Sequence, residues 1–231
     1  MKKLSLLLII PILSSIFLRF SLTEEPALFS AKIDSFLNEM NTKYKEKGSD
    51  SAWNYYPVIK QQLIGSKMDD FDLKDVDGIK ISLNSIKTPL IIDATASWCA
   101  PCVASIPVIN QLAKKYDGKV KFLLITHDEQ GNAKKLSKKY NSNIIIIPAT
   151  ESKNLNNMVK SNSGKFKHIF PYPTAYFINK DKAISAIKSG GAVPGSFPIS
   201  ETETMNVSKK EAFETNLKIL ESGIAKIVEN K

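Results

Sequence analysis

The chain has 231 residues, of which 43% are hydrophobic and 24% charged, proportions that are ordinary for a globular protein and exclude a fibre or a largely disordered chain. The formal net charge is +9. The lysines are scattered beside polar residues at helical spacing, as on a solvated helix face, and no nucleic-acid-binding motif accompanies them. We therefore expect no nucleic-acid partner.

The N-terminus has the pattern of a targeting segment. A short positive region, Met1-Lys2-Lys3, precedes an apolar run over residues 4–18, which Arg19 interrupts. This run suits the core of a secretory signal peptide and is shorter than the about 20 residues of a typical membrane-spanning helix. No Ala-x-Ala cleavage site follows it, so an uncleaved anchor stays an alternative. We expect residues 1–23 to be a signal peptide or a membrane anchor, and the rest of the protein to be extracytoplasmic, in the periplasm or cell envelope.

A helical extension is predicted over residues 24–64. Apolar side chains recur there at helical spacing, namely Phe29, Ile33, Phe36, Leu37 and Met40. A polar break at residues 48–50 separates this stretch from a second helical stretch that ends near residue 63. We expect the extension to pack on a main domain of residues 65–231.

The main domain begins with alternating strands and helices. Residues 71–75 and 79–83 alternate around Asp77-Gly78, which indicates a β-hairpin. Residues 89–94 form a nearly continuous apolar run, typical of a strand buried on both faces. A helix over 101–116, a strand over 120–126, a lysine-rich helix over 131–140 and a strand over 144–147 are then predicted.

The second half of the domain has less regular patterns. We expect residues 151–170 to be irregular, with a short helix near 155–160. Residues 174–178 and 183–187 form an antiparallel strand pair, and residues 190–208 a long loop. Ser208 is a plausible N-cap of the last helix, with Glu211 completing a capping box. The order of elements predicts an α/β fold with a central mixed β-sheet flanked by helices.

The only two cysteines of the chain are Cys99 and Cys102. A secreted protein stapled by disulfides has more cysteines at wider spacing, and a loop closed over two intervening residues adds little stability. The two functions that remain for the cysteine pair are redox chemistry and metal binding. A structural zinc site needs four ligands, and the chain offers only His127 and His168 besides the cysteines, so we reject structural zinc and expect no bound metal.

The position of the pair favours redox chemistry. It lies where a buried strand gives way to a helix, so that Cys99 would be near free backbone N–H groups and the positive end of the helix dipole. Both stabilise a thiolate and lower the pKa of the thiol. Cys102 falls one turn inside on the same side, where its sulfur can resolve a mixed disulfide formed at Cys99. Pro101 is tolerated because first-turn N–H groups have no helical partner.

Residues 90–107 closely resemble thioredoxin. That family has a buried acid six residues before the first active-site cysteine, here Asp93, a tryptophan before that cysteine, here Trp98, and a proline five residues after the second cysteine, here Pro107. It also has a cis-proline before a strand opposite the dithiol, which Tyr172-Pro173-Thr174 resembles. The resemblance covers about residues 65–188 and implies a thioredoxin fold.

The resemblance implies a role for each residue. Cys99 and Cys102 are catalytic, and no cofactor beyond this dithiol/disulfide is expected. Asp93, whose pKa burial should raise, accepts a proton from Cys102; the alternative is a buried acid paired with a lysine. Trp98, Tyr172 and Pro173 are the substrate-binding candidates, and the alternative for Trp98 is a structural residue that only packs. Of the two histidines, His127 is expected on a surface loop, and His168 is a weaker candidate for approaching the dithiol.

The leader and the upstream hairpin resemble the TlpA-like and ResA-like branch of extracytoplasmic thiol–disulfide oxidoreductases. This resemblance implies a reductase of disulfides in exported proteins, with apo-cytochrome c as a candidate, supplied with electrons by a membrane-borne donor. Ala100-Pro101 supports this direction, because it places no cation or histidine between the cysteines to stabilise a reduced thiolate. A disulfide donor or isomerase and a copper-delivery protein are the alternatives. A peroxiredoxin is largely rejected, because Ile92 and Ala96 replace the proline and threonine of its pattern.

Overall fold

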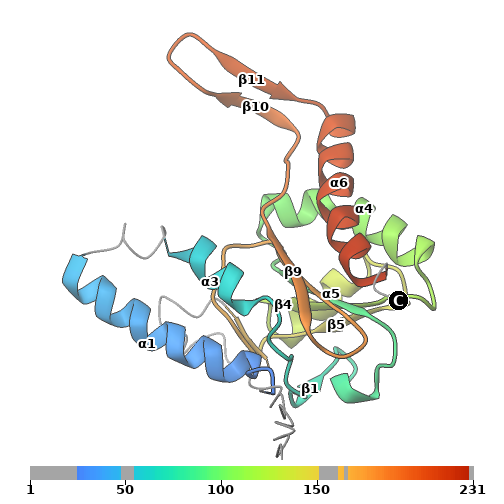
Figure 1. Ribbon diagram of the computed structural model, residues 1–231. Coiled ribbons are helices and arrows are strands. Elements are labelled where there is room, and N and C mark those ends of the chain that lie inside the picture. The colour runs from blue at the N-terminus through green and yellow to red at the C-terminus, as the bar shows by residue number, and fades with distance from the viewer. Residues whose placement is uncertain (1–24, 48–54, 151–160, 164–165, 229–231) are drawn as a thin grey trace, which may run out of the picture.

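The computed structural model describes residues 25–47, 55–150, 161–163 and 166–228 (Figure 1). The predicted leader, the polar break at 48–50 and the short helix expected near 155–160 lie outside the described residues. No helix in the described part of the chain is both long and apolar enough to cross a membrane.

A five-stranded mixed sheet forms the centre of the molecule, in the order β5-β4-β3-β8-β9. Its strands are β3 (Leu90–Thr95), β4 (Lys121–Thr126), β5 (Ile144–Ile147), β8 (Thr174–Ile178) and β9 (Ile184–Ser189). β3, β4 and β5 run parallel, whereas β8 is antiparallel to both β3 and β9. This topology confirms the predicted α/β thioredoxin fold.

Strand β3 occupies the middle of this sheet, and every one of its residues is buried. The strand pairs with β4 on one edge and β8 on the other, and helices cover both faces, so its side chains alternate between two apolar cores. Leu90 and Ile92 belong to one core and Ile91 to the other. The apolar run is therefore explained by a strand enclosed on all sides.

Different helices cover the two faces (Figure 1). On one face lie α4 (Ala100–Lys115), α5 (Gln130–Ser137) and α6 (Lys209–Val228). On the other lie α1 (Phe29–Lys47) and α3 (Tyr56–Leu63). α5 ends at Ser137, earlier than the predicted residue 140, because residues 138–140 turn into the loop before β5. α6 begins as predicted: Ser208 Oγ accepts from the Glu211 N–H at 3.1 Å, and the Glu211 carboxylate accepts from the Ser208 N–H at 2.7 Å.

The helical extension shares one core with the sheet. All five apolar residues predicted to face inward from α1 are buried. The Phe29 ring stacks on Phe166 with centroids 5.4 Å apart and meets Tyr176 of β8 edge-on. The extension packs on the main domain as predicted, and its apolar side chains share one core with those of the sheet.

The predicted N-terminal hairpin is present but short. β1 (Leu73–Lys74) pairs antiparallel with β2 (Lys80–Ile81), and a 3-10 turn, η1 (Leu83–Ser85), follows. Gly78 adopts a φ of +83° at the turn, a conformation that glycine takes without steric cost.

The prediction of irregular structure over residues 151–170 is wrong for its described C-terminal part. β6 (Ser161–Ser163) and β7 (Phe166–His168) form a small antiparallel ribbon. Phe166, Ile169 and Phe170 are completely buried. The polar Ser-Asn-Ser sequence of β6 does not have the pattern of a strand. The ribbon is stabilised by the burial of the apolar residues that follow β6 in the chain.

The prediction of a long loop over residues 190–208 is also wrong. β10 (Gly195–Pro198) and β11 (Thr204–Val207) form an antiparallel hairpin that projects from the body (Figure 1). We call residues 195–207 the arm. The glycine, proline, serine and threonine content predicted a loop, whereas the register pairs Phe197 with Met205 across the two strands.

We predict that Gly223→Ala destabilises the protein, because a Cβ at this position in α6 would lie 2.3 Å from the ring of Phe177, which is buried in β8. Overpacking of this kind costs about 1–3 kcal/mol. Gly131→Ala in α5 is the matched control, since nothing lies within 4 Å of its added Cβ. Urea unfolding of both variants measures the effect, and equal stabilities would contradict the packing described.

Candidate active site

Cys99 and Cys102 are joined in a disulfide at the N-terminus of α4. Cys99 is the N-cap of the helix, and its sulfur accepts a hydrogen bond from the Cys102 N–H at 3.4 Å. Both cysteines are buried and pack against Ala96 and Tyr172. The predicted placement of the pair is confirmed, and the backbone N–H groups of the first helical turn are available to stabilise a thiolate at Cys99.

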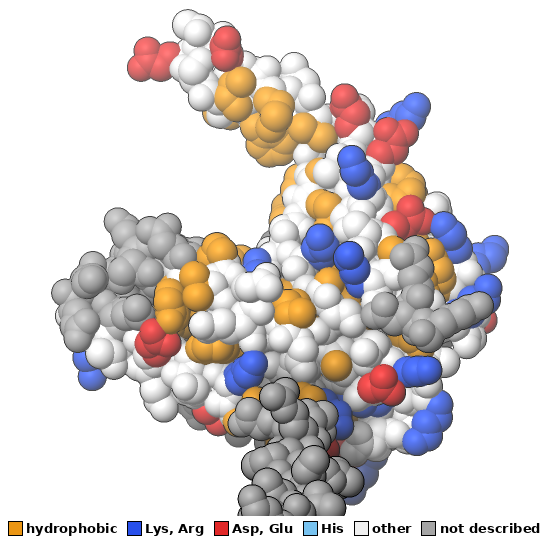
Figure 2. Space-filling view, in the orientation of Figure 1, with side chains coloured by type: hydrophobic (Ala, Val, Ile, Leu, Met, Phe, Trp, Pro, Cys, Tyr) orange, Lys and Arg blue, Asp and Glu red, His pale blue; other side chains and the backbone are white. Residues whose placement is uncertain are grey.

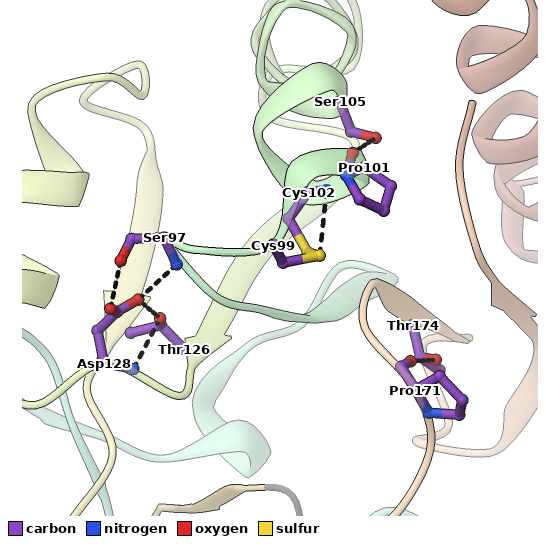
Figure 3. The surroundings of a disulfide bond; sticks show 9 residues. All are labelled: Ser97, Cys99, Pro101, Cys102, Ser105, Thr126, Asp128, Pro171 and Thr174. Atoms are coloured by element: carbon purple, nitrogen blue, oxygen red, sulfur yellow. Dashed lines mark hydrogen bonds between the residues drawn. A yellow bond between two sulfur atoms is a disulfide. The ribbon is translucent and has the colours of Figure 1, made fainter. Parts of the chain in front are cut away.

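The loop that leads to Cys99 is held by Asp128, a residue that the sequence reasoning missed (Figure 3). The Asp128 carboxylate accepts hydrogen bonds from the Ser97 N–H at 2.8 Å, the Ser97 hydroxyl at 2.5 Å and the Thr126 hydroxyl at 2.5 Å. Asp128 is buried at the C-terminal end of β4, beside the same end of β3. Its signal was an acid two residues after a buried strand, since the carboxyl ends of neighbouring parallel strands meet at one edge of a sheet.

Three rings surround the exposed side of the site. Trp98, His127 and Tyr172 meet edge to face, with centroid separations of 5.7, 5.8 and 6.0 Å. The Tyr172 hydroxyl lies 3.5 Å from Nδ1 of His127. His127 lies in the bend after β4, as expected for a loop residue, and it is half-buried because its ring contacts Trp98 and Tyr172. Trp98 is 65% exposed and so is available to a partner.

His168 approaches the dithiol only through another residue. It is fully buried, its Nδ1 is hydrogen-bonded to the Tyr176 hydroxyl at 2.9 Å, and its ring stacks on Tyr172 with centroids 5.1 Å apart. Tyr172 in turn packs against the cysteines. His168 therefore supports Tyr172 from behind.

The Tyr172–Pro173 peptide bond is cis, as the resemblance implied. Figure 3 shows the segment from Pro171 to Thr174 on the side of the cysteines opposite Asp128. The Thr174 hydroxyl donates to the Pro171 carbonyl at 2.7 Å, and the Pro173 carbonyl accepts from the Gly190 N–H at 2.9 Å. The segment is thus tied to the chain that leads into the arm.

Asp93 is buried in β3, and desolvation raises its pKa to about 7. A cavity of about 20 Å³, room for one water molecule, adjoins it. Ser105 and Ile109 line this cavity from the face of α4 that also carries Cys102. Lys188 lines it as well, but no ion pair involves Asp93 among the described residues. A carboxyl with a pKa of about 7, facing the side of α4 that carries Cys102, suits proton transfer near neutral pH.

No group of three or more His, Cys, Asp and Glu side chains in the described ranges is arranged to hold a metal ion. The copper alternative would need either His127 or His168 as a third ligand beside the two thiolates, and both histidines make the ring contacts described above.

A family model described as the AhpC/TSA family matches residues 64–187, more than half of the chain. The chain belongs to the AhpC/TSA family. The match begins before the N-terminal hairpin and ends within β9, so it includes the dithiol, Asp93 and the cis-proline segment and leaves out the arm and α6.

Several curated proteins are similar to this AhpC/TSA chain. The thiol-disulfide oxidoreductase ResA of Bacillus thuringiensis subsp. konkukian is 29% identical over 138 residues, which cover 58% of this chain and 75% of ResA. The thioredoxin-like protein YneN of Bacillus subtilis is 24% identical over 61% of this chain and 82% of YneN. An M-type chloroplast thioredoxin of Pisum sativum is 44% identical over 46 residues, so this chain spans only 27% of that protein.

Solved structures with similar folds include the exposed lipoprotein thioredoxin Etrx1 of Streptococcus pneumoniae, at 22% identity and a TM-score of 0.41 over 65% of this chain and 98% of that one. A thio-disulfide isomerase from Thermus thermophilus has 20% identity and a TM-score of 0.44, over 56% and 87% of the two chains. The family, the helix-capping dithiol and the similarity to ResA together identify the chain as a thiol–disulfide oxidoreductase of the thioredoxin fold.

The surroundings of Cys99 do not have the peroxiredoxin pattern. Ala96 packs against both cysteines at the position where that pattern has a threonine. Ile92 lies inside β3 and contributes to the core below the sheet at the position of the proline. Cys99 therefore has the surroundings of one member of a dithiol pair, whose other member, Cys102, lies one helical turn away.

We predict that Asp93 makes the oxidised protein less stable as the pH rises. Its pKa in the folded state, about 7, exceeds the ordinary value of 3.8, so the folded state binds more protons between these values and the free energy of unfolding falls across that window. The loss should approach about 4 kcal/mol, at about 1.36 kcal/mol for each pH unit.

Urea unfolding of the oxidised protein from pH 4 to 8 measures this loss. Asp93→Asn should flatten the pH dependence, and Asp72→Asn, at an exposed acid, should leave it unchanged. Parallel curves for the wild type and Asp93→Asn would contradict the account.

We predict that Asp128→Ala destabilises the loop before Cys99, because it leaves the Ser97 N–H without its acceptor. The free energy of unfolding should fall by roughly 1–3 kcal/mol, and exchange of the Ser97 amide hydrogen should become faster. Ser97→Ala is the milder comparison, since it loses only the hydroxyl contact and keeps the N–H bond. Unchanged amide exchange in Asp128→Ala would show that the carboxylate does not hold this loop.

Proposed function

We propose that the protein reduces disulfides of exported proteins outside the cytoplasm. The observation that carries this proposal is the placement of Cys99 as the N-cap of α4, with Cys102 buried one turn inside and Asp93 beneath the same helix. The lysine-plus-apolar pattern of residues 1–18 supports export or membrane anchoring. Apo-cytochrome c is a candidate target, and a membrane-borne dithiol protein is the class of electron donor that such a reductase needs.

The reaction is a two-electron exchange between dithiols. The Cys99 thiolate attacks one sulfur of a target disulfide; that S–S bond breaks, a mixed disulfide forms, and the other target sulfur leaves as a thiolate that takes up a proton. Cys102 then gives its proton to Asp93 and attacks the Cys99 sulfur. The Cys99–Cys102 disulfide forms, the second target sulfur is released, and the target has gained the two electrons that this protein lost.

The surroundings of the dithiol support a reducing direction. Ala100 and Pro101 place no cation between the cysteines, whereas a strongly oxidising couple depends on extra stabilisation of its reduced thiolate. The exposed Trp98 ring lies directly before Cys99 in the chain and meets Tyr172 of the cis-proline segment edge to face, so the two together offer a target chain a surface at the reacting sulfur.

Trapping with Cys102→Ala tests the proposed chemistry. Without the resolving thiol, the mixed disulfide at Cys99 persists, so mass spectrometry should find a covalent adduct with an oxidised target protein that dithiothreitol releases. The doubly substituted Cys99→Ala/Cys102→Ala variant is the control and should form no adduct, and a target reduced beforehand should form none either. The absence of a dithiothreitol-sensitive adduct with oxidised targets would overturn the proposal.

A further inference from the structure

The arm has one apolar and one polar face. Phe197 lies opposite Met205 and Gly195 opposite Val207, so these side chains share a face with Ile199 at the end of the strand. The other face carries two polar or small pairs, Ser196–Asn206 and Pro198–Thr204. Its Ser196 and Asn206 side chains are hydrogen-bonded to each other. The arm is therefore a two-stranded ribbon with apolar side chains on one face and mostly polar side chains on the other.

The apolar face of the arm is open to solvent. Phe197 is 36% exposed, Met205 48% and Ile199 61%. Figure 2 shows apolar side chains along the underside of the arm, which stands clear of the body. A two-stranded hairpin is marginally stable alone, and clustered exposed apolar side chains mark interaction sites.

The root of the arm is fixed to the redox site. The Asn216 side chain of α6 accepts from the Ala192 N–H at 2.7 Å and donates to the Ala192 carbonyl at 3.0 Å. Gly191 lies against α4, where an added Cβ would be 3.6 Å from the Pro101 side chain between the two cysteines. With the bond from Gly190 to Pro173, three consecutive residues connect the arm to α6, α4 and the cis-proline segment.

Apolar surface is also exposed at the dithiol itself. Trp98, directly before Cys99, is 65% exposed, and Val103, directly after Cys102, is 39% exposed. A polypeptide with its disulfide at Cys99 would contact these side chains, and the segment that leads into the arm lies close to Pro101, between the two cysteines. A target protein at the dithiol is therefore near the root of the arm.

We propose that the arm is a docking surface for the disulfide-bearing target protein, which it holds through apolar side chains near the target's disulfide. The proposal rests on the proposed function. A few exposed side chains fall short of the about 800 Å² that each partner buries in a standard stable interface, which argues against a permanent dimer of this chain through the arm. A small surface suits a target that must leave after each reaction.

The test compares a protein substrate with a small one. Phe197→Ser/Met205→Ser removes the centre of the apolar face, and Thr204→Ala, on the polar face of the same ribbon, is the matched control. The pre-reduced full-length proteins are mixed with scrambled, oxidised ribonuclease A or with 5,5′-dithiobis(2-nitrobenzoate). The second-order rate constant of disulfide reduction is measured for each substrate.

We expect the double variant to react roughly tenfold more slowly with scrambled ribonuclease, equivalent to about 1.4 kcal/mol, and at the wild-type rate with the small disulfide. The Thr204→Ala control should match the wild type on both. Equal rates of the double variant and the wild type on ribonuclease would overturn the docking role, as would parallel losses on both substrates. A variant that replaces residues 195–207 by Gly-Gly gives the same test without the arm.

Two further outcomes separate the proposals. A wild type that reduces neither substrate refutes the proposed function, whereas a wild type that reduces both, unaffected by the arm variants, refutes only the docking role. Sedimentation of the wild type and the double variant tests a second copy as occupant. A dimer that the double substitution dissociates would assign the apolar face to self-association and overturn the proposal.

Discussion

The enclosure of strand β3 determines where Asp93 and the two cysteines lie. The strand is hydrogen-bonded on both edges and buried on both faces, and the chain leaves it after Thr95. Residues 96–99 then lead into α4, and Cys99 becomes the N-cap of that helix. The same enclosure buries Asp93 and raises the pKa of its carboxyl. Helix-end electrostatics at Cys99 and a titratable acid beneath Cys102 are two consequences of one central strand.

The residues that could be predicted from the sequence are those whose signal is local. Cys99 and Cys102 are recognised by their spacing. Asp93 is recognised by its apolar neighbours, and Pro173 by the strand that follows it. Asp128 and His127 could not be predicted in this way, since their roles depend on the parallel pairing of β4 with β3, which brings the ends of the two strands together. Sequence periodicity identifies strands but does not identify their neighbours.

The misjudged segments have a common physical cause. In the arm and in β6, small and polar residues predominate, so composition predicted loops where backbone pairing forms ribbons. The β6–β7 ribbon is stabilised by burial of Phe166 against Phe29, a contact between segments far apart in the chain. No described residue covers the exposed apolar face of the arm. The arm is instead fixed at its root, where the Ala192 N–H donates to the Asn216 side chain. Backbone pairing between strands therefore formed ribbons in both segments, and a tertiary contact supports only the β6–β7 ribbon.

The central claim is that electrons flow from the Cys99–Cys102 dithiol to the target disulfide. The most direct test is the reduction potential of the Cys99–Cys102 couple, determined by equilibrating the full-length protein with thiol buffers of defined potential and quantifying labelled thiols. The account predicts a potential near that of thioredoxin, about −270 mV. A potential near the strongly oxidising value of about −120 mV would contradict it and make the protein a disulfide donor.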